Sequence, residues 1–463
     1  MKMIFNVEDK PKLPQLVIFA LQQLLAVLAA TIAVPIIIGN GLTPAAAMFG
    51  AGAGTLVYVL ITKRKSPVFL GSSFAFIGSM TAAFAGGVSM QLGMVGLMIG
   101  AVSAGLVYVI LALLVGKVGV GWINKLMPPV VIGPTVAIIG LSLAGNAISD
   151  LQKSNAVTYD DASYTAVICG LITLVIVIVC ATYGSKRIKL VPFVAGILVG
   201  YVAAAVLTVV GNAVDINAFK LVDFNIFPKM LYENGEITIG TFFKAPDFVI
   251  DLSLDGFRQL NASYIATILV AYIPVAFVVF AEHVADHKNL SSVIGRDLLR
   301  EPGLKRTLLG DGIGSMVGAL FGGCPNTTYG ESIGCVAITR NASTVTIIAA
   351  SLGCMALSFF TPFIAFISSI PSCVMGGVCI ALYGFIAVSG LKMLSGVDLD
   401  KNGNIFTVSV ILIAGVGGLS ISFGSVIITK IAVALILGIL TNLMLSRENN
   451  KTGSDEDQGK DAD

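Results

Sequence analysis

The stretch GGCPNTTYGE, residues 322–331, interrupts a long apolar region with glycine, proline and small polar residues. A second stretch, FLGSSFAF at residues 69–76, has the same character. Glycine and proline disfavour an unbroken helix, while Thr, Tyr and Phe tolerate extended backbone. We therefore expect each stretch to be a short extended segment that leads into a half-helix. The alternative is a continuous helix in which Gly and Ser allow close helix packing.

The chain around these stretches has the composition of a membrane protein. Its 463 residues are 56% hydrophobic and 12% charged, with a mean hydropathy of +0.93. Soluble domains carry about 25% charged residues, so a soluble globular fold is excluded and lipid is the expected solvent. The net charge of +2 gives no global field that would favour nucleic acid. The predicted fold class is an all-α polytopic membrane protein.

The apolar runs divide into fourteen predicted transmembrane segments, because a spanning helix needs about 20 largely apolar residues. Two segments each fall in 13–62, 66–116, 341–391 and 402–446, two short ones in 307–340, and single ones in 126–149, 162–185, 190–214 and 259–281. The basic clusters, at 63–65, 186–189, 288–306 and 392–401, all follow even-numbered segments. The positive-inside rule then places both termini in the cytoplasm. It places the acidic connection 213–258 outside.

The two halves of the chain share a pattern at an odd offset. Segment five begins PPVVIG at 128–133, and segment twelve begins PSCVMG at 371–376. Seven segments separate them, so the halves would enter the membrane in opposite senses. This predicts two inverted repeats of seven segments, with a substrate site near the midplane where the halves meet. The same offset pairs the two broken stretches, which would be segments three and ten.

Two carboxylates stand inside or at the end of these segments. Glu282 ends an apolar run in segment eight, and Glu331 lies inside segment ten. An ionisable group at such depth is a functional candidate, although pairing with another helix or a position at the interface would also explain it. A lactam ring such as a nucleobase suits them, because carboxylates accept from ring N–H groups and half-helix N–H groups donate to ring carbonyls. Burial disfavours the charged form, so the sequence predicts proton exchange without a cofactor.

The two histidines occur in EHVADH, residues 282–287. His283 and His287 are four residues apart and share a helix face. The HExxH pattern is missing and no cysteine is near, so a proton relay or a polar helix end is favoured over a metal site. The absence of HExxH and of paired catalytic Asp motifs also argues against a membrane enzyme. A passive channel remains an alternative that proton dependence of uptake would separate.

These motifs resemble the nucleobase–ascorbate transporter family (nucleobase:cation symporter-2), most of all its bacterial uracil branch. The resembling stretches, spread through residues 10–445, are LGSSFAFI (70–77), AEHV (281–284), DLLREPGL (297–304), PNTTYGES (325–332), GCVAITR (334–340) and VMGGV (374–378). The resemblance implies that Glu282, Glu331, Phe74, Gly330 and Ala30 contact the substrate. It also implies that the coupling ion is H⁺, and we expect the set Glu282, His283, Asp286 and His287 to carry it.

Three positions depart from the family pattern. Ser332 stands where relatives usually have Asn, and Gln23 stands where they often have His. Asp286 occupies the place of the second His in their Glu-His-x-Gly-His pattern. These departures bear on the support of the site and on the proton route.

The resemblance also implies a division into two domains and a mode of action. The core domain would comprise 15–117 and 259–367, and the gate domain 126–212 and 371–446. The cytoplasmic N-terminus (1–14), the outer connection (213–258) and a disordered cytoplasmic tail (447–463) complete the chain. The implied protein is a homodimeric, proton-coupled importer of a nucleobase, uracil foremost. The alternatives are a xanthine or purine permease, or a transporter of another small anion on the same fold.

Overall fold

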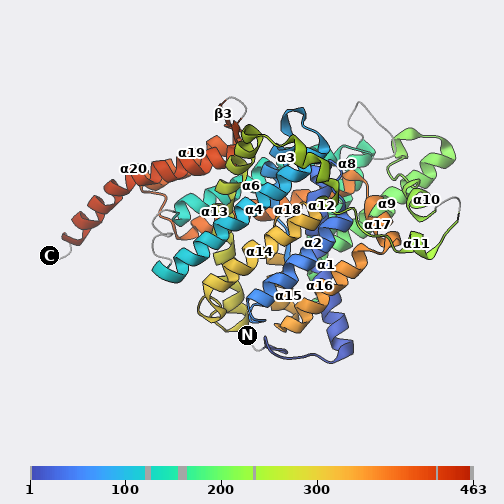
Figure 1. The fold of residues 1–463 in the computed structure, drawn as a ribbon, viewed down its shortest axis with the longest axis horizontal. Helices are drawn as coiled ribbons and strands as arrows, with labels where there is room; N and C mark the ends of the chain where they lie inside the picture. Colours follow the sequence, from blue (N-terminus) through green and yellow to red (C-terminus); the bar gives the residue numbers. More distant parts are fainter. Residues whose placement is uncertain (1–2, 120–126, 155–163, 233–235, 424–425, 459–463) are drawn as a thin grey trace.

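The computed structural model describes residues 3–119, 127–154, 164–232, 236–423 and 426–458, and they form a mainly helical bundle (Figure 1). The elements of the first half are α1 (Leu13–Ile38), α2 (Pro44–Ile61), β1 (Leu70–Ser72), η1 (Phe74–Phe76), α3 (Ile77–Ala83), α4 (Met90–Val118), α6 (Pro129–Ser142), α7 (Ala144–Leu151), α8 (Tyr164–Tyr183) and α9 (Pro192–Val214). The connection carries the short helices α10 (Ile226–Leu231), α11 (Ile239–Phe242) and α12 (Val249–Leu252). The second half contains α13 (Ala262–Ile294), η6 (Leu299–Gly303), α14 (Leu304–Gly322), β2 (Asn326–Thr328), α15 (Gly330–Thr339), α16 (Thr344–Ser358), α17 (Thr361–Ser368), α18 (Ser372–Lys392), η7 (Met393–Gly396), α19 (Asn402–Val416), β3 (Ile421–Phe423), β4 (Val426–Ile428) and α20 (Lys430–Gln458).

Each apolar run from which the transmembrane segments were predicted contains helices of the described part. By length and composition, eight helices of the described part could cross a membrane. They are Leu13–Ile38, Pro44–Ile61, Met90–Val118, Pro129–Leu151, Tyr164–Tyr183, Pro192–Val214, Ala262–Ile294 and Ser372–Gly396. Shorter apolar helices occupy Thr344–Ser358, Asn402–Val416 and Lys430–Leu445. The chain is thus a multi-pass membrane protein. The predicted boundary at 126 lies outside the described residues.

The two broken stretches form extended segments, as predicted, and they pair with each other. Strands β1 and β2 run antiparallel, with Leu70 opposite Thr328 and Ser72 opposite Asn326. Beyond the strands, the Ser73 amide donates to the Pro325 carbonyl at 2.9 Å. Each strand leads into a short helix, η1 with α3 after β1 and α15 after β2. The ladder therefore joins the starts of two half-helices inside the protein.

Helix α2 shields this ladder from one side. Thr55 Oγ1 accepts from the Leu70 amide at 2.9 Å and lies 3.1 Å from the Leu70 carbonyl. The side-chain amide of Asn326 donates to the Gly50 carbonyl at 3.0 Å. Leu70 and Thr55 are completely buried, and Asn326 is 1% exposed. Irregular backbone is tolerated at membrane depth only where the protein supplies its hydrogen bonds, and α2 does so here.

Small residues bring the surrounding helices close together. Gly310, Gly314, Gly318 and Gly322 recur every fourth residue along α14 and so lie on one face, against α2. A Cβ atom added at Gly318 would lie 2.0 Å from the Asn326 side-chain nitrogen. This small-xxx-small spacing allows backbones to approach in membrane proteins. It lets the Asn326 side chain pass between α14 and α2.

A second group of helices surrounds α18. This helix packs against α6, α7 and α8, while α19 packs against α6 and α20. Helices α8 and α9 pack against each other. In the apolar stretch of each helix, only about a third of the residues are buried. They form an outer edge of the molecule. The pairing of α14 with α2 and α4 and the packing around α18 thus define two separate groups of helices.

The C-terminal tail differs from the prediction. Residues 447–458, expected to be disordered, continue α20 as a helix that projects from the bundle (Figure 1). Extending an existing helix needs no new nucleation, so a polar tail can follow an apolar helix without a break. Residues 459–463 lie outside the described part of the chain.

We predict that Thr55→Val destabilises the protein by about 1–3 kcal/mol, because Val has the same shape but leaves the Leu70 amide without its partner. The matched control is Thr135→Val, since Thr135 is equally buried but bonds only to Val131 of its own helix. Thermal unfolding can be followed with a thiol-reactive dye, because six of the seven cysteines are buried. Equal melting midpoints for the two variants would contradict the role of Thr55.

Candidate functional site

A cavity of about 400 Å³ lies where the β1–β2 crossing meets α13, α6, α9 and α18. Four of the five residues predicted to contact a substrate line it: Phe74, Glu282, Gly330 and Glu331. Asp286, one turn beyond Glu282 on α13, lines it as well. Glu282 and Glu331 are 49 residues apart in sequence, yet they face one cavity. The fold thus brings three carboxylates together.

The start of α15 presents backbone as well as a carboxylate. Gly330 is the first residue of α15, and Glu331 lies in its first turn. The amides of a first helical turn have no backbone partner within the helix, so they can donate to a side chain or to a ligand. A Cβ atom added at Gly330 would meet no atom within 4 Å, so this position is open. The Tyr329 hydroxyl fixes the turn by donating to the Ser72 carbonyl at 2.7 Å.

The opposite wall of the cavity is largely apolar. It is formed by residues of α6, α9 and α18, namely Val136, Ile139, Phe193, Leu382, Phe385, Ile386 and Ser389. Phe74 packs edge-on against Tyr383 of α18, with ring centroids 5.9 Å apart. An apolar wall facing a few convergent polar groups is the usual form of a small-molecule site. The arrangement fits a flat ring with a polar edge.

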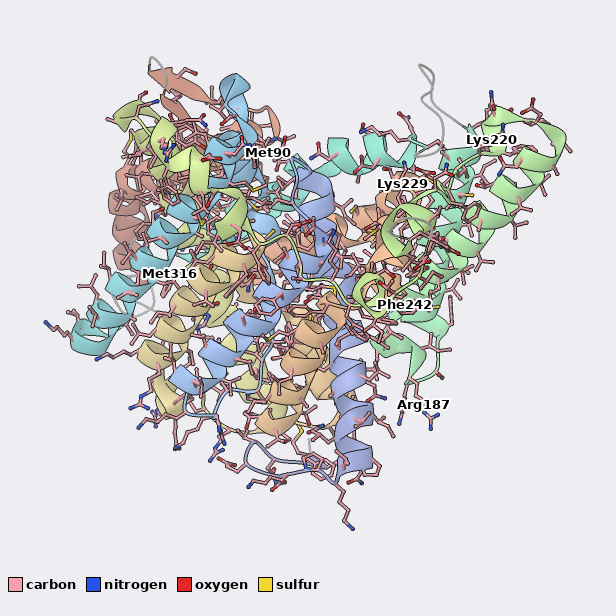
Figure 2. The ribbon with its side chains drawn as sticks, turned by 45° about the vertical axis from the view of Figure 1, so that its right-hand side comes forward. Met90, Arg187, Lys220, Lys229, Phe242 and Met316 are labelled. Atoms are coloured by element: carbon pink, nitrogen blue, oxygen red, sulfur yellow. The ribbon has the colours of Figure 1, made fainter. Side chains whose placement is uncertain are left out.

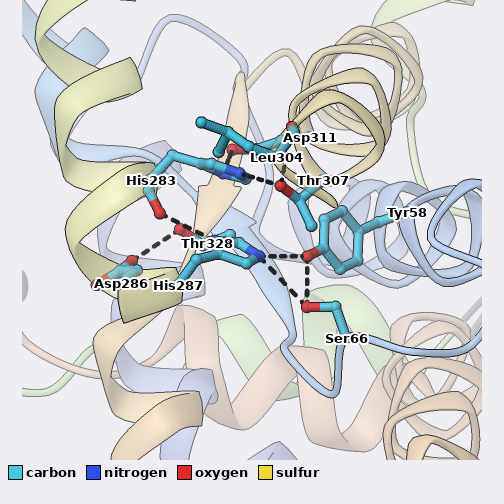
Figure 3. A network of polar contacts seen from close by, with 9 residues as sticks. All are labelled: Tyr58, Ser66, His283, Asp286, His287, Leu304, Thr307, Asp311 and Thr328. Carbon is cyan, nitrogen blue, oxygen red and sulfur yellow. Dashed lines mark hydrogen bonds and ion pairs between the residues drawn. The ribbon is translucent and has the colours of Figure 1, made fainter. Parts of the chain in front are cut away.

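Asp286 lies on the side of α13 that faces β2, whereas His283 and His287 face α14 and α2 (Figure 3). Asp286 accepts a hydrogen bond from the Thr328 hydroxyl of β2 at 2.7 Å. His283 and His287 are each 1% exposed and are not among the residues that line the cavity. Their rings stack with centroids 4.0 Å apart, so the predicted shared helix face is confirmed. The structure thus separates the two histidines from the two carboxylates of this helix.

The histidines are held by a buried polar network. His283 Nδ1 lies 2.7 Å from Asp311 Oδ2, and its Nε2 lies 3.0 Å from the Thr307 hydroxyl. His287 Nδ1 donates to the His283 carbonyl at 2.9 Å. His287 Nε2 lies 2.7 Å from the Tyr58 hydroxyl. Because a carbonyl only accepts, Nδ1 of His287 carries a proton, and in neutral His287 Nε2 is the acceptor. Figure 3 shows this network between α13, α14 and α2.

Ala30 is the predicted substrate contact that the structure does not bring to this cavity. It is 2% exposed within α1 and does not appear in the cavity wall. Sequence reasoning also missed Asp311 and Thr328 as partners of the site. An acid between the glycines of an apolar helix was the available signal for Asp311, whereas Thr328 had none. Within the described residues, no three His, Cys, Asp or Glu side chains converge as a metal site requires.

Two of the three departures from the family pattern contact each other. The side-chain amide of Gln23 on α1 donates to the Ser332 hydroxyl, which also accepts from the Phe69 amide at 2.9 Å. Gln23 is 2% exposed and Ser332 is fully buried. One hydroxyl thus links α1, the residue before β1 and the first turn of α15. Ser332 follows Glu331 directly, so this link fixes the backbone from which Glu331 projects.

Comparison with known proteins adds sequence and fold relatives. The model of the Permease family matches residues 14–423. The uracil permease of Bacillus caldolyticus is 39% identical over 448 residues, which cover 96% of this chain and 95% of the relative. That of Escherichia coli (strain K12) is 34% identical, covering 95% and 93%. The transmembrane domain of a cyanobacterial bicarbonate transporter, BicA, shares the fold with a TM-score of 0.62 at 14% identity, covering 92% and 95%.

We predict that Gln23 and Ser332 are energetically coupled. Ser332→Ala leaves the Gln23 amide and the Phe69 amide unpaired, whereas adding Gln23→Leu removes one of these orphaned groups. The double variant should therefore be less destabilised than the sum of the single variants, by about 0.5–3 kcal/mol. Melting midpoints of the four proteins measure the coupling. In the control cycle, Gln22→Leu replaces Gln23→Leu. Coupling of equal size in that cycle would contradict a specific interaction between Gln23 and Ser332.

Proposed function

The chain belongs to the Permease family, and on that premise we propose that it is a proton-coupled importer of a nucleobase, with uracil as the preferred substrate. It is a transporter rather than an enzyme, because the relatives that share its full length are permeases. The observation that carries the proposal is the convergence of Glu282 and Glu331 on one cavity that has an apolar opposite wall. Uracil offers alternating N–H and C=O groups along its edge, and carboxylates and free helix amides complement them.

In the proposed binding mode, each side of the cavity takes a different part of the ring. Glu282 and Glu331 accept from ring N–H groups, and the amides near Gly330 donate to a ring carbonyl. Phe74 covers one face of the ring. Ala30 would act only indirectly, through the packing of α1, because it is absent from the cavity wall.

Proton coupling follows from the charges of the cavity. Glu282, Asp286 and Glu331 line one space whose opposite wall is apolar. Carboxylates that share a site repel each other when all are ionised, so binding a proton there is favourable. The proton would reside on the Glu282–Asp286 pair, with His283 and His287 orienting α13 from behind. A neutral ring could then enter together with the proton, which supports H⁺ rather than a bound cofactor as the coupling agent.

Alternating access would arise from motion of the core domain (15–117 and 259–367) against the gate domain (126–212 and 371–446). The substrate cavity lies between the two groups of helices. A second cavity, of about 530 Å³, shares Ala285 and Met393 with it and reaches Lys288 and Lys305. These lysines belong to a basic cluster that the positive-inside rule assigns to the cytoplasm. The second cavity is therefore the proposed cytoplasmic exit.

The topology in this proposal is fourteen segments in two inverted repeats, with both termini cytoplasmic. The antiparallel pairing of β1 with β2 supports it, since inverted halves would bring equivalent segments together in opposite directions. Figure 2 shows Arg187 near the end of the molecule at which α1 begins, and Lys220 of the connection near the opposite end. The apolar outer faces of α8 and α9 support a homodimer formed through gate helices.

A purine such as xanthine is the second candidate substrate, because the same groups could bind its pyrimidine ring. Anion transport is disfavoured although the bicarbonate transporter shares the fold. Three carboxylates around the cavity would repel an anion, and no Lys or Arg lines it. Fold similarity at this level of identity carries no substrate information.

The test of the function is uptake of labelled uracil into proteoliposomes that contain the full chain. We expect uptake to rise when the outside is more acidic, and unlabelled uracil to compete better than xanthine, urate or ascorbate. Glu282→Gln should abolish the response to the pH gradient. Wild-type uptake that is the same with and without the pH gradient would indicate a passive channel. Stronger competition by xanthine than by uracil would indicate a purine permease.

We predict that Glu331→Gln weakens uracil binding roughly 10- to 100-fold, the value of a hydrogen bond to a charged acceptor. The control is Glu301→Gln, because Glu301 lies in the exposed turn η6 and pairs there with Lys65. Calorimetry on purified protein measures the affinity, and the melting midpoint reports folding. A folded Glu331→Gln protein with unchanged affinity would remove Glu331 from the site.

A further inference from the structure

A small cavity of about 10 Å³ lies behind β2, separate from the substrate cavity. It is enclosed by α4, α14, β2 and Phe76. Tyr108 of α4 and Asp311 of α14 both line it. Thr327 of β2 lines both this cavity and the substrate cavity. The space corresponds to about one water molecule.

Two buried oxygens at this cavity lack partners. Asp311 Oδ1 and the Tyr108 hydroxyl have no hydrogen-bond partner anywhere in the described part of the chain. The residues are 1% and 4% exposed. The other oxygen of Asp311 is occupied by His283, and the Tyr108 ring packs edge-on against the same histidine with centroids 6.2 Å apart. A buried oxygen without a hydrogen-bond partner destabilises the protein, because it has lost its hydrogen bonds to water. A polar ligand that bonds to both oxygens would offset this penalty.

We propose that a single water molecule binds in this cavity as a permanent part of the protein. It donates one hydrogen bond to Asp311 Oδ1 and accepts one from the Tyr108 hydroxyl. Its second hydrogen faces the other polar residues of the wall, Ser315, Asn326 and Thr327. A buried water typically makes about three hydrogen bonds to groups that would otherwise be unsatisfied, and this wall provides that number.

Water fits the cavity better than a sodium ion does. A hard cation needs about six oxygen ligands around it, which a space for one small molecule bounded in part by Phe76 and Ala104 does not supply. The carboxylate of Asp311 is also already engaged by His283. The water would complete the hydrogen bonds of Asp311 and so fix the carboxylate that holds His283 behind Glu282 and Asp286.

The sign of the stability change in Tyr108→Phe tests the proposal. If the hydroxyl holds a water, its removal costs a hydrogen bond and leaves the water poorly held, so the melting midpoint falls by about 1–3 °C. If the cavity is dry, the change removes an unsatisfied buried oxygen, and the midpoint stays or rises. The matched control is Tyr272→Phe, because the Tyr272 hydroxyl is also buried without a partner among the described residues but does not line this cavity. Its midpoint should not fall.

Two further measurements identify the occupant. A structure of the full chain at about 2 Å resolution should show density within roughly 2.7–3.2 Å of Asp311 Oδ1 and the Tyr108 hydroxyl. The melting midpoint should be the same in sodium and in choline chloride of equal concentration. A cavity without density, or a midpoint for Tyr108→Phe at or above that of the wild type, would overturn the proposal. Saturable stabilisation by sodium that is lost in Tyr108→Phe would also overturn it, in favour of a cation site.

Discussion

The antiparallel pairing of Leu70–Ser72 with Asn326–Thr328 is the interaction on which the rest of the structure depends. Extended backbone at membrane depth is costly unless protein groups satisfy it, and this ladder lets two chain segments satisfy each other. Because each strand then enters a short helix, the pairing places two helix starts beside one space. That placement brings the first-turn amides of α15 and the Glu331 carboxylate to the cavity. A continuous helix through either stretch would have kept its amides within the helix and would have left no site at the crossing.

Helix α13 contributes carboxylates to the cavity at this crossing, and hydrogen bonds on its other side hold the helix in place. Four polar residues occupy little more than one turn, and helical geometry separates them into two pairs. Glu282 and Asp286 line the cavity, while His283 and His287 are buried among hydrogen-bond partners from α14 and α2. The histidine pair has every ring nitrogen engaged, so rotation of α13 would break several bonds at once. These bonds therefore hold the orientation of the helix that carries the two carboxylates.

The sequence was informative where a local pattern has a local cause. Glycine and proline density predicted the two extended stretches. The depth of Glu282 and Glu331 in apolar runs marked them as functional candidates, and both line one cavity. It was uninformative where the partner is set by tertiary packing. The contact of Gln23 with Ser332 joins residues 309 positions apart, and Thr328 looks like any strand residue until Asp286 is placed beside it. Ala30 is not among the residues that line the cavity, and the sequence could not indicate this, since the orientation of α1 depends on what packs against it.

Comparison with the bicarbonate transporter separates what the fold carries from what the side chains carry. The two chains share a fold at 14% identity, and a fold alone does not determine which molecule a transporter carries. In this chain, three carboxylates line the cavity and no basic side chain does. When ionised, carboxylates that line a partly apolar space would repel an anion. The same charges favour a proton and ring N–H donors. The side chains at the crossing, and not the crossing itself, therefore determine the charge of the cavity.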